Sequence, residues 1–283
     1  MTDRYAVIGN PIGHSKSPFI HMTFARETAQ DLIYVAIEGP LGGFASQVDA
    51  FRRGGGQGMN VTLPFKLDAC AYATDLHESA RLAGAANALK FEGDRVHARN
   101  FDGLGLVNDI QRNLGFPLRG KRVLMLGAGG AARGAMLPFL NAGVSRVVIA
   151  NRTFSRAMAL AERFAQHGEV VAVDPHDLAA QAPFDLLINA TSATLAGVSP
   201  EVPAACFGAG SLAYEMLYGK GLTPFLTLAR AAGAARVADG VGMLVEQAAE
   251  AFAWWRGVRP ETAPVIAAMT VPLTGQSHIR FGR

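Results

Sequence analysis

A short glycine-rich stretch, Gly127-Ala128-Gly129-Gly130-Ala131, has the residue types and spacing of a nucleotide-binding turn. It follows an apolar run at 122–126 and opens a stretch of small helix-forming residues at 131–142. In such a strand-turn-helix unit the glycines permit a tight turn and let a pyrophosphate approach the N-terminus of the helix. Glycine-rich turns also join strands to helices in unrelated proteins, so a purely structural turn is the alternative.

The residues about 20 positions further on indicate which nucleotide fits, because an Asp or Glu there holds the ribose 2′-hydroxyl of NAD. This chain instead has Asn151-Arg152-Thr153, with Arg156 one helical turn later. Guanidinium groups bind phosphate oxygens through paired hydrogen bonds, so the two arginines favour a ribose that carries a 2′-phosphate. The sequence therefore predicts NADP(H) as the cofactor; two solvated arginines beside an ordinary turn are the alternative.

Two serines could hold a small anion. Ser15 and Ser17 lie in a Gly- and Pro-bounded loop after a strand end, where hydroxyls and nearby N–H groups can bind a carboxylate. Ser17 followed by Pro18 is also a normal pair for the N-cap and first turn of a helix. A capping role for Ser17, alone or together with binding, therefore stays open.

If the predicted NADP(H) exchanges hydride with an alcohol or a carbonyl compound, the reaction also needs a group that exchanges the hydroxyl proton. Lys66 is the candidate for that step. Asp102, expected at the end of the last short strand of the first domain, would be the carboxylate that holds its amine in place. The alternative for Lys66 is a solvated lysine at a helix start.

The bulk properties limit the class of protein. The chain has 283 residues and is 50% apolar, which is enough for two domains with buried cores. No stretch approaches the roughly 20 uninterrupted apolar residues of a membrane span, and no signal sequence precedes the first strand, so a cytoplasmic protein is expected. The net charge of +3 is dispersed, which predicts no nucleic-acid partner. Cys70 and Cys206 lack metal-ligand spacing, so two reduced thiols and no metal site are expected.

Strand-like and helix-like segments alternate along the chain. In the first hundred residues we expect strands at 5–8, 32–37 and 59–62, and helices at 18–28, 43–53 and 65–72. A helix at 104–114 leads to further strands at 122–126, 146–150, 170–173, 186–190 and 211–214. This alternation predicts an α/β fold whose second half is a parallel, doubly wound sheet.

The segments predict two domains. An N-terminal αβ substrate domain, 1–103, would be completed by C-terminal helices at 240–270, the main one at 243–255. A Rossmann-type NADP-binding domain would occupy 104–239, with a cleft between the two domains. The polar tail, 271–283, has no periodicity and is expected to be loosely ordered. A monomer and a homodimer both fit the sequence.

Eight motifs occur in the order found in one family of dehydrogenases. The first half contains GNPIGHSKSP at 9–18, NVTLPFK at 60–66, GAAN at 84–87 and NFDG at 100–103. The second half contains NRTFSRA at 151–157, NATS at 189–192, YEMLY at 214–218 and GVGMLVEQAA at 240–249. Over residues 4–268 the chain closely resembles the shikimate dehydrogenase family. The resemblance implies reversible, NADPH-dependent reduction of 3-dehydroshikimate to shikimate.

The resemblance also implies roles for individual residues. Lys66 and Asp102 would form the catalytic pair. The substrate would be bound by Ser15, Ser17, Asn60, Thr62, Asn87, Gln247 and, from the cofactor domain, Tyr218. The cofactor would be bound by Gly127, Ala128, Gly129, Gly130, Ala131, Asn151, Arg152, Thr153, Arg156, Thr191 and Gly240.

The chain departs from the family pattern at four positions. The family usually has Thr where this chain has Ala88 and Phe101, a Gly close to Thr194, and Asp where Glu215 stands. We expect the ring of Phe101, beside Asp102, to remove a substrate hydrogen bond or to reshape the hinge. Two alternative functions stay open: a paralogue that also uses quinate, and a non-catalytic NADP(H)-responsive binding protein.

Overall fold

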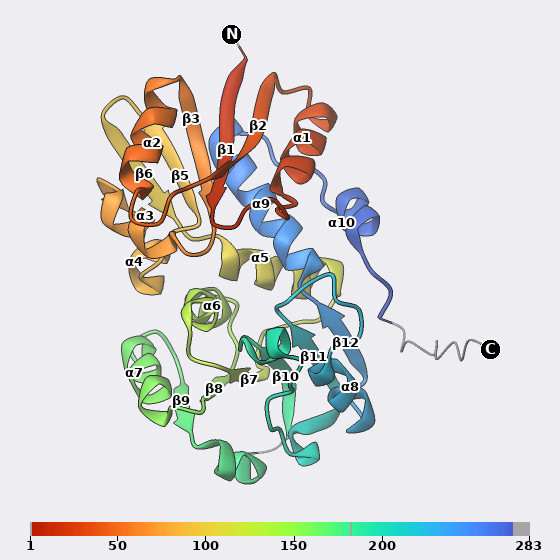
Figure 1. Ribbon diagram of the computed structural model, residues 1–283. Coiled ribbons are helices and arrows are strands. Elements are labelled where there is room, and N and C mark those ends of the chain that lie inside the picture. The colour runs from red at the N-terminus through yellow and green to blue at the C-terminus, as the bar shows by residue number, and fades with distance from the viewer. Residues whose placement is uncertain (1, 182, 274–283) are drawn as a thin grey trace, which may run out of the picture. The chain divides into compact units, whose positions relative to one another are not determined.

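The computed structural model describes residues 2–181 and 183–273, and its contacts divide the chain into two units (Figure 1). The first unit comprises Met1–Leu118, Gly130–Gly143 and Gly242–Ala268; the second comprises Arg119–Gly129, Val144–Val241 and Met269–Arg283. Residues 274–283 of the predicted tail lie outside the described residues. Of the helices described, none is both long and apolar enough to cross a membrane.

The sheet of the first unit is mixed. In spatial order its strands are β2 (Leu32–Glu38), β1 (Asp3–Gly9), β3 (Gly56–Val61), β5 (Ala88–Glu92), β6 (Arg95–Arg99) and β4 (Asp75–Leu76). Strand β1 is parallel to β2 and β3, while β5 is antiparallel to both β3 and β6. The ends of β1, β3 and β6 and the beginning of β5 therefore lie along one edge of the sheet. Loops that are far apart in sequence meet there.

Helices pack on both faces of this sheet, because successive side chains of a strand point to opposite faces. Ala6 and Ile8 join one apolar cluster with Phe44 and Val48 of a helix. On the other face Tyr5 stacks on Trp255, with the ring centroids 4.8 Å apart. The helices of this unit are α1 (Ser17–Glu27), α2 (Phe44–Arg53), α3 (Lys66–Tyr72), α4 (Glu78–Ala83), α5 (Asp102–Asn108), α6 (Gly130–Asn141), α9 (Val241–Arg256) and α10 (Ala263–Met269).

Helices α5 and α6 approach each other at glycines. A Cβ atom added to Gly103 would lie 2.1 Å from the carbonyl oxygen of Gly134, so only glycine allows this approach. The helix predicted at 104–114 begins earlier, at Asp102, and its last turn, Asp109–Asn113, is a π-helix. Asp102 was expected at the end of a strand, but β6 ends at Arg99 and Asp102 lies in the first turn of α5.

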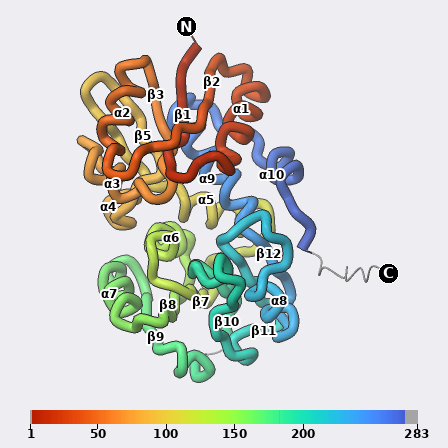
Figure 2. Tube along the Cα trace, viewed as in Figure 1, coloured from red at the N-terminus to blue at the C-terminus, as the bar shows by residue number. Residues whose placement is uncertain are grey.

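The second unit contains a sheet in which every pair of neighbours is parallel. The spatial order is β12 (Arg236–Asp239), β11 (Phe207–Glu215), β10 (Phe184–Asn189), β7 (Arg122–Leu126), β8 (Arg146–Ala150) and β9 (Val170–Val173). From β7 the chain adds β8 and then β9 on one side of the sheet. It then returns to the other side of β7, where it adds β10, β11 and β12 in turn (Figure 2). This is the strand order of a Rossmann sheet, so the prediction of a doubly wound parallel sheet is confirmed. Ligands of such sheets bind at the carboxyl ends of the two central strands, here β7 and β10.

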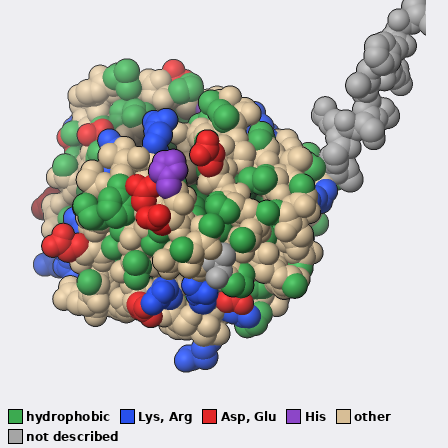
Figure 3. All heavy atoms as spheres, turned by 90° about the horizontal axis from the view of Figure 1, so that it is seen from below, with side chains coloured by type: hydrophobic (Ala, Val, Ile, Leu, Met, Phe, Trp, Pro, Cys, Tyr) green, Lys and Arg blue, Asp and Glu red, His purple; other side chains and the backbone are tan. Residues whose placement is uncertain are grey.

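Helices α7 (Phe154–Phe164) and α8 (Pro224–Ala231) accompany this sheet, with 3₁₀ turns at Pro175–Gln181, Ala193–Ala196 and Ala204–Cys206. The bounds predicted for β7, β8 and β9 are confirmed. Strand β11 begins at Phe207, earlier than predicted, because a register shift lets Phe207 pair with Phe184. On the face drawn in Figure 3, basic and acidic side chains lie interspersed.

Candidate active site

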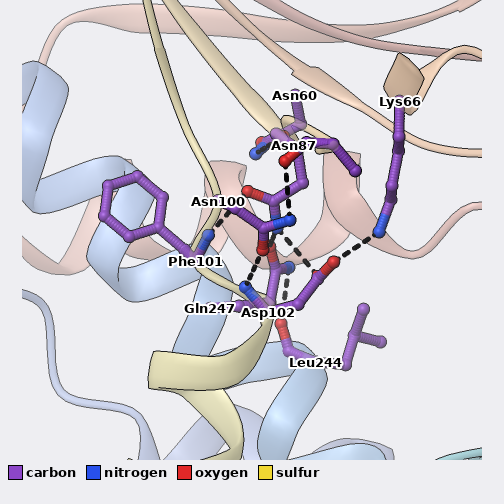
Figure 4. Close-up of polar contacts among 9 residues, drawn as sticks. Asn60, Lys66, Asn87, Asn100, Phe101, Asp102, Leu244 and Gln247 are labelled. Carbon is purple, nitrogen blue, oxygen red and sulfur yellow. Dashed lines mark hydrogen bonds and ion pairs between the residues drawn. The ribbon is translucent and has the colours of Figure 1, made fainter. Parts of the chain in front are cut away.

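Lys66 and Asp102 meet at the sheet edge of the first unit, where β3 and β6 end (Figure 4). Lys66 is the first residue of α3 and Asp102 the first residue of α5. The lysine Nζ lies 2.5 Å from the aspartate Oδ2, and the two side chains are 26% and 17% exposed. The pair is therefore mostly screened from water but can still be reached by a ligand. Such a setting suits proton exchange with a bound hydroxyl.

Asn87 holds the carboxylate of this pair in place. Its Oδ1 accepts a hydrogen bond from the backbone N–H of Phe101 at 2.9 Å. Its Nδ2 donates to Asp102 Oδ1 at 2.8 Å and to Gln247 Oε1 at 3.1 Å. Because the amide oxygen faces an N–H, the NH₂ group must face Asp102. One carboxylate oxygen of Asp102 is thus bound by Asn87 and the other by Lys66 (Figure 4).

Gln247 reaches this cluster from α9, which lies far away in the sequence. Its Nε2 donates to the carbonyl of Leu244 at 2.9 Å while its Oε1 accepts from Asn87. A Cβ atom at Gly105 of α5 would lie 2.6 Å from the backbone nitrogen of Gln247. Glycine at 105 therefore lets α5 and α9 approach closely enough for this side chain to reach the site.

Asn60 lies at the end of β3 and is buried. Its Nδ2 donates to the carbonyl of Asn87 at 3.1 Å, and its Oδ1 accepts from the Tyr34 hydroxyl at 2.6 Å. These two contacts fix the orientation of the Asn60 amide. Thr62 follows β3 and is half-buried.

Ser15 lies in the loop that leads from β1 to α1, and Ser17 is the first residue of α1. The Ser17 backbone N–H donates to the Ser15 hydroxyl at 3.3 Å. The capping interpretation of Ser17 is wrong, because the N-cap is Lys16, whose side chain makes no capping hydrogen bond, and Ser17 is the first helical residue. The hydroxyl of Ser17 instead contacts the buried Tyr34, whose pKa is raised by burial and lowered in part by this hydrogen bond. Ser17 is itself buried, while Ser15 is half-exposed.

Two residues that hydrogen-bond to the predicted site residues, Asn100 and Tyr34, are absent from the set predicted from sequence. Asn100 accepts the backbone N–H of Asp102 on its Oδ1 at 3.0 Å and donates to the Ala85 carbonyl at 2.9 Å. The spacing of two residues between Asn100 and Asp102 is that of an Asx turn, which the sequence could have indicated. Tyr34 carries no such signal, since a tyrosine in the edge strand β2 reads as a core or surface residue.

The side chain of Phe101 points away from the ion pair (Figure 4). It is buried and packs edge-on against Trp254, with the ring centroids 5.7 Å apart. Only its backbone N–H contacts the polar cluster, through Asn87. The ring therefore fills space between β6, α5 and α9, and the expectation that it removes a substrate hydrogen bond or reshapes the hinge stays a prediction.

The glycine-rich loop follows β7 at the carboxyl edge of the second sheet. Gly127 has a positive φ of 103°, and a Cβ there would lie 3.1 Å from the carbonyl oxygen of Ala190. Both observations require glycine at this position. Cβ atoms at Gly129 and Gly130 would meet nothing within 4 Å, and α6 begins at Gly130, before Ala131. Ala128 lies between Gly127 and Gly129. Because nothing crowds Gly129 and Gly130, their backbone is accessible to a pyrophosphate.

Arg152 and Arg156 lie after the end of β8, the strand next to β7. Both side chains are exposed, as is Thr153. Asn151 donates its Nδ2 to the Thr153 carbonyl at 2.8 Å and thereby shapes the turn that carries Arg152. The donors present at this turn fit the 2′-phosphate of NADP(H).

Three further predicted residues lie in loops at the carboxyl ends of β10, β11 and β12. Thr191 donates both its backbone N–H and its hydroxyl to Asn189 Oδ1, at 3.1 and 2.6 Å. A Cβ atom at Gly240 would lie 2.2 Å from the Met216 carbonyl oxygen, so glycine is required there. Burial raises the pKa of Tyr218, which keeps its hydroxyl protonated as a donor.

Comparison with known proteins identifies the family. Three family models match: the shikimate dehydrogenase substrate binding domain at residues 7–89, shikimate / quinate 5-dehydrogenase at 109–205, and the shikimate 5′-dehydrogenase C-terminal domain at 240–270. The chain is 55% identical to a shikimate dehydrogenase (NADP(+)) from Nitrosospira multiformis over 269 residues, 95% of this chain and 98% of that one.

Solved structures give the same result. An Ael1 enzyme from Pseudomonas putida is 58% identical with a TM-score of 0.93, covering 96% of this chain and all of that one. A shikimate 5-dehydrogenase from Thermus thermophilus, in complex with NADP(H) and shikimate, is 33% identical with a TM-score of 0.84, covering 95% of this chain and 98% of that one. The chain therefore belongs to the shikimate dehydrogenase family of NADP-dependent oxidoreductases.

Proposed function

We propose that this protein catalyses the reversible, NADPH-dependent reduction of 3-dehydroshikimate to shikimate, with Lys66 as the group that exchanges the hydroxyl proton. The observation that carries the proposal is the contact of 2.5 Å between Lys66 Nζ and Asp102 Oδ2. Around this contact Asn87 and Gln247 supply further hydrogen-bonding groups. The family membership and the NADP-dependent relatives agree with this chemistry.

In the oxidative direction the bound NADP accepts hydride from the carbon that carries the reacting hydroxyl. The hydroxyl loses its proton at the same time, and a positioned side chain must receive it. In our proposal this proton passes to the Lys66–Asp102 pair, and it returns to the carbonyl oxygen in the reductive direction. Asp102 keeps the amine in place, and Asn87 fixes the aspartate so that Oδ2 faces the lysine.

The remaining predicted residues bind the two ligands in this proposal. The carboxylate and ring hydroxyls of the substrate would be bound by Ser15, Ser17, Asn60, Thr62, Asn87, Gln247 and Tyr218. The cofactor would be bound by the glycine-rich turn at 127–131 together with Asn151, Arg152, Thr153, Arg156, Thr191 and Gly240. Two observations support this cofactor site. The backbone of Gly129 and Gly130 is accessible, and the side chains of Arg152 and Arg156 are exposed.

A turnover assay with NADP and shikimate, run beside quinate, tests the proposal. We expect shikimate to be oxidised with the higher kcat/KM. Faster turnover of quinate would assign the chain to the paralogue that uses both acids. NADPH binding without turnover of either acid would favour the non-catalytic alternative.

The domain roles, the location and the assembly are also proposals. We assign substrate binding to 1–103 with 240–270 and cofactor binding to 104–239; the contacts group α5 and α6 with the first unit. A cytoplasmic location follows from the proposed biosynthetic role and is tested by cell fractionation. Light scattering would distinguish the monomer from the homodimer.

A further inference from the structure

Glu215 is a fully buried carboxylate at the end of β11, directly beside Asn189 at the end of β10. Its Oε2 accepts hydrogen bonds from Asn189 Nδ2 at 2.9 Å, from the Thr194 hydroxyl at 2.6 Å and from the Thr223 hydroxyl at 3.3 Å. Its Oε1 accepts the backbone N–H of Leu217 at 3.3 Å. A buried carboxylate is costly unless donors surround it, so the segments that carry these donors are held where the carboxylate requires them.

The donors come from separate segments of the second unit. Thr194 belongs to the 3₁₀ turn after β10, and Leu217 belongs to the turn after β11. Thr223 is the N-cap of α8, where its hydroxyl also accepts the Leu226 N–H. Glu215 therefore ties the turns after two neighbouring strands to the start of a helix.

Both turns lead directly to residues of the proposed cofactor site. Asn189, bound to Glu215 through its Nδ2, accepts the two donors of Thr191 on its Oδ1. The Thr191 methyl group lies within 3.2 Å of where a Cβ of Gly127 would be, so this turn packs against the start of the glycine-rich loop. On the other side the Leu217 carbonyl accepts the Gly240 N–H at 3.2 Å.

Thr194 and Glu215 act as a pair. The Thr194 hydroxyl accepts from Asn189 at 3.1 Å and donates to Glu215 at 2.6 Å, so it closes a triangle with the carboxylate and the amide. We propose that the pair Thr194–Glu215 positions the turns that carry Thr191 and Leu217 and thereby sets the affinity for NADP(H) without touching the cofactor. The proposal rests on the cofactor site assigned above, and both members are positioning residues.

The decisive variant is Thr194→Val, which keeps the shape of the side chain and removes its hydroxyl. A hydrogen bond to a charged group is stronger than one between neutral groups, and part of its loss is expected to reach the turn. We expect the Kd for NADPH, measured by titration of its fluorescence, to rise about three- to tenfold. The kcat at saturating NADP should stay within about twofold, because the Lys66–Asp102 contact lies in the first unit.

Thr227→Val is the matched control, since the exposed Thr227 donates only to the carbonyl of Thr223 in its own helix. Its Kd should equal that of the unmodified protein. Glu215→Gln should also weaken NADPH binding, because an amide cannot accept at both of its ends. The double variant, Thr194→Val with Glu215→Gln, should bind NADPH no more weakly than the single variant with the higher Kd, since both changes break the same contact.

A Kd for the Thr194→Val variant within twofold of the unmodified protein would overturn the proposal. So would a double variant whose loss equals the product of the two single losses, because the residues would then act independently. The titration needs no substrate, so it gives its answer even if the protein fails to oxidise shikimate. Should Glu215→Gln not fold, the Thr194→Val and Thr227→Val comparison decides alone.

Discussion

At the scale of single residues, the proposed chemistry depends on amide side chains that hold one carboxylate. Asp102 is bound at Oδ1 by Asn87 and at Oδ2 by Lys66, and its backbone N–H is bound by Asn100. An ion pair on an open surface would contribute little to stability, and its side chains would exchange partners. Here the aspartate has fixed partners on each side, so the lysine amine has a defined position from which to exchange a proton.

Replacement of the lysine tests this arrangement. Lys66→Ala should lower kcat by about 10²- to 10⁴-fold, the range for losing a positioned proton-transfer group, with a much smaller change in the KM for shikimate. Asp102→Asn should act in the same direction. Lys90→Ala is the control, because Lys90 forms a comparable ion pair with Glu92 outside the cluster. A kcat for Lys66→Ala within threefold of the unmodified enzyme would remove the lysine from the mechanism.

Arg152 provides the corresponding test of cofactor choice. Its charge-assisted hydrogen bonds to the 2′-phosphate should be worth roughly 1.5 to 3 kcal/mol, so Arg152→Ala should raise the KM for NADP about tenfold or more. The KM for NAD should hardly change, because NAD lacks that phosphate. Arg230→Ala, at another exposed arginine of the second unit, is the control. Equal use of NAD and NADP by the unmodified enzyme would contradict the role given to the arginines.

At the scale of elements, the turn from β6 into α5 carries both polar and apolar constraints. The backbone N–H groups of Phe101 and Asp102 are bound by asparagine side chains, while the Phe101 ring packs on Trp254 of α9. Trp254 also has the guanidinium of Arg99 over its ring, 4.9 Å from the centroid. Phe101 therefore anchors α5 and the site to α9, a role that its position beside Asp102 did not indicate.

Phe101→Thr should therefore destabilise the protein, although the family usually has threonine at this position. Truncating a buried phenylalanine costs about 3 to 5 kcal/mol when it is replaced by alanine, and threonine fills little more of the space. We expect a loss of about 2 to 4 kcal/mol in the free energy of unfolding, measured in urea. Phe101→Leu, which keeps most of the apolar volume, should lose less. A Phe101→Thr variant as stable as the unmodified protein would show that the ring is not an anchor.

Sequence patterns predicted the elements better than the contacts between them. Strands β7 and β8 show as short apolar runs because both of their faces are buried, and the edge strand β9 shows as a run of β-branched residues; all three were predicted with correct bounds. Lys66 and Asp102 were predicted as site residues because they lie in the motifs at 60–66 and 100–103. Tyr34 was not, because its role depends on the register that places β2 beside β1 and on its contact with Asn60. The strand before Asp102 was predicted to extend too far, because the Asx turn that Asn100 forms with Asp102 was overlooked.

At the scale of the whole molecule, a buried histidine makes the stability of the first unit depend on pH. In the first unit the imidazole of His21 is buried among aromatic rings and lies parallel to Tyr34, with centroids 4.2 Å apart. Within the part of the chain that the structure describes, neither ring nitrogen has a hydrogen-bond partner. Burial lowers the pKa of His21 to about 3, so the ring is neutral at pH 7.

This burial makes the first unit sensitive to acid. The pKa of His21 is near 6.5 when the chain is unfolded and about 3 when it is folded, so between these values the unfolded state binds more protons. The free energy of unfolding should therefore fall by about 1.4 kcal/mol per pH unit as the pH drops below 6.5, and level off below 3. Between pH 7 and pH 5 the loss from this one group is about 2 kcal/mol.

His21→Phe isolates this contribution, because phenylalanine suits the aromatic surroundings and cannot titrate. Unfolding in urea at pH 7 and pH 5 can be followed by tryptophan fluorescence, which reports on the first unit because both tryptophans, Trp254 and Trp255, belong to it. We expect the unmodified protein to lose about 2 kcal/mol more than the variant between these two pH values. Other carboxylates and histidines titrate equally in both proteins, so the difference belongs to His21. Equal losses in the two proteins would mean that the imidazole is protonated, or open to water, in the folded state.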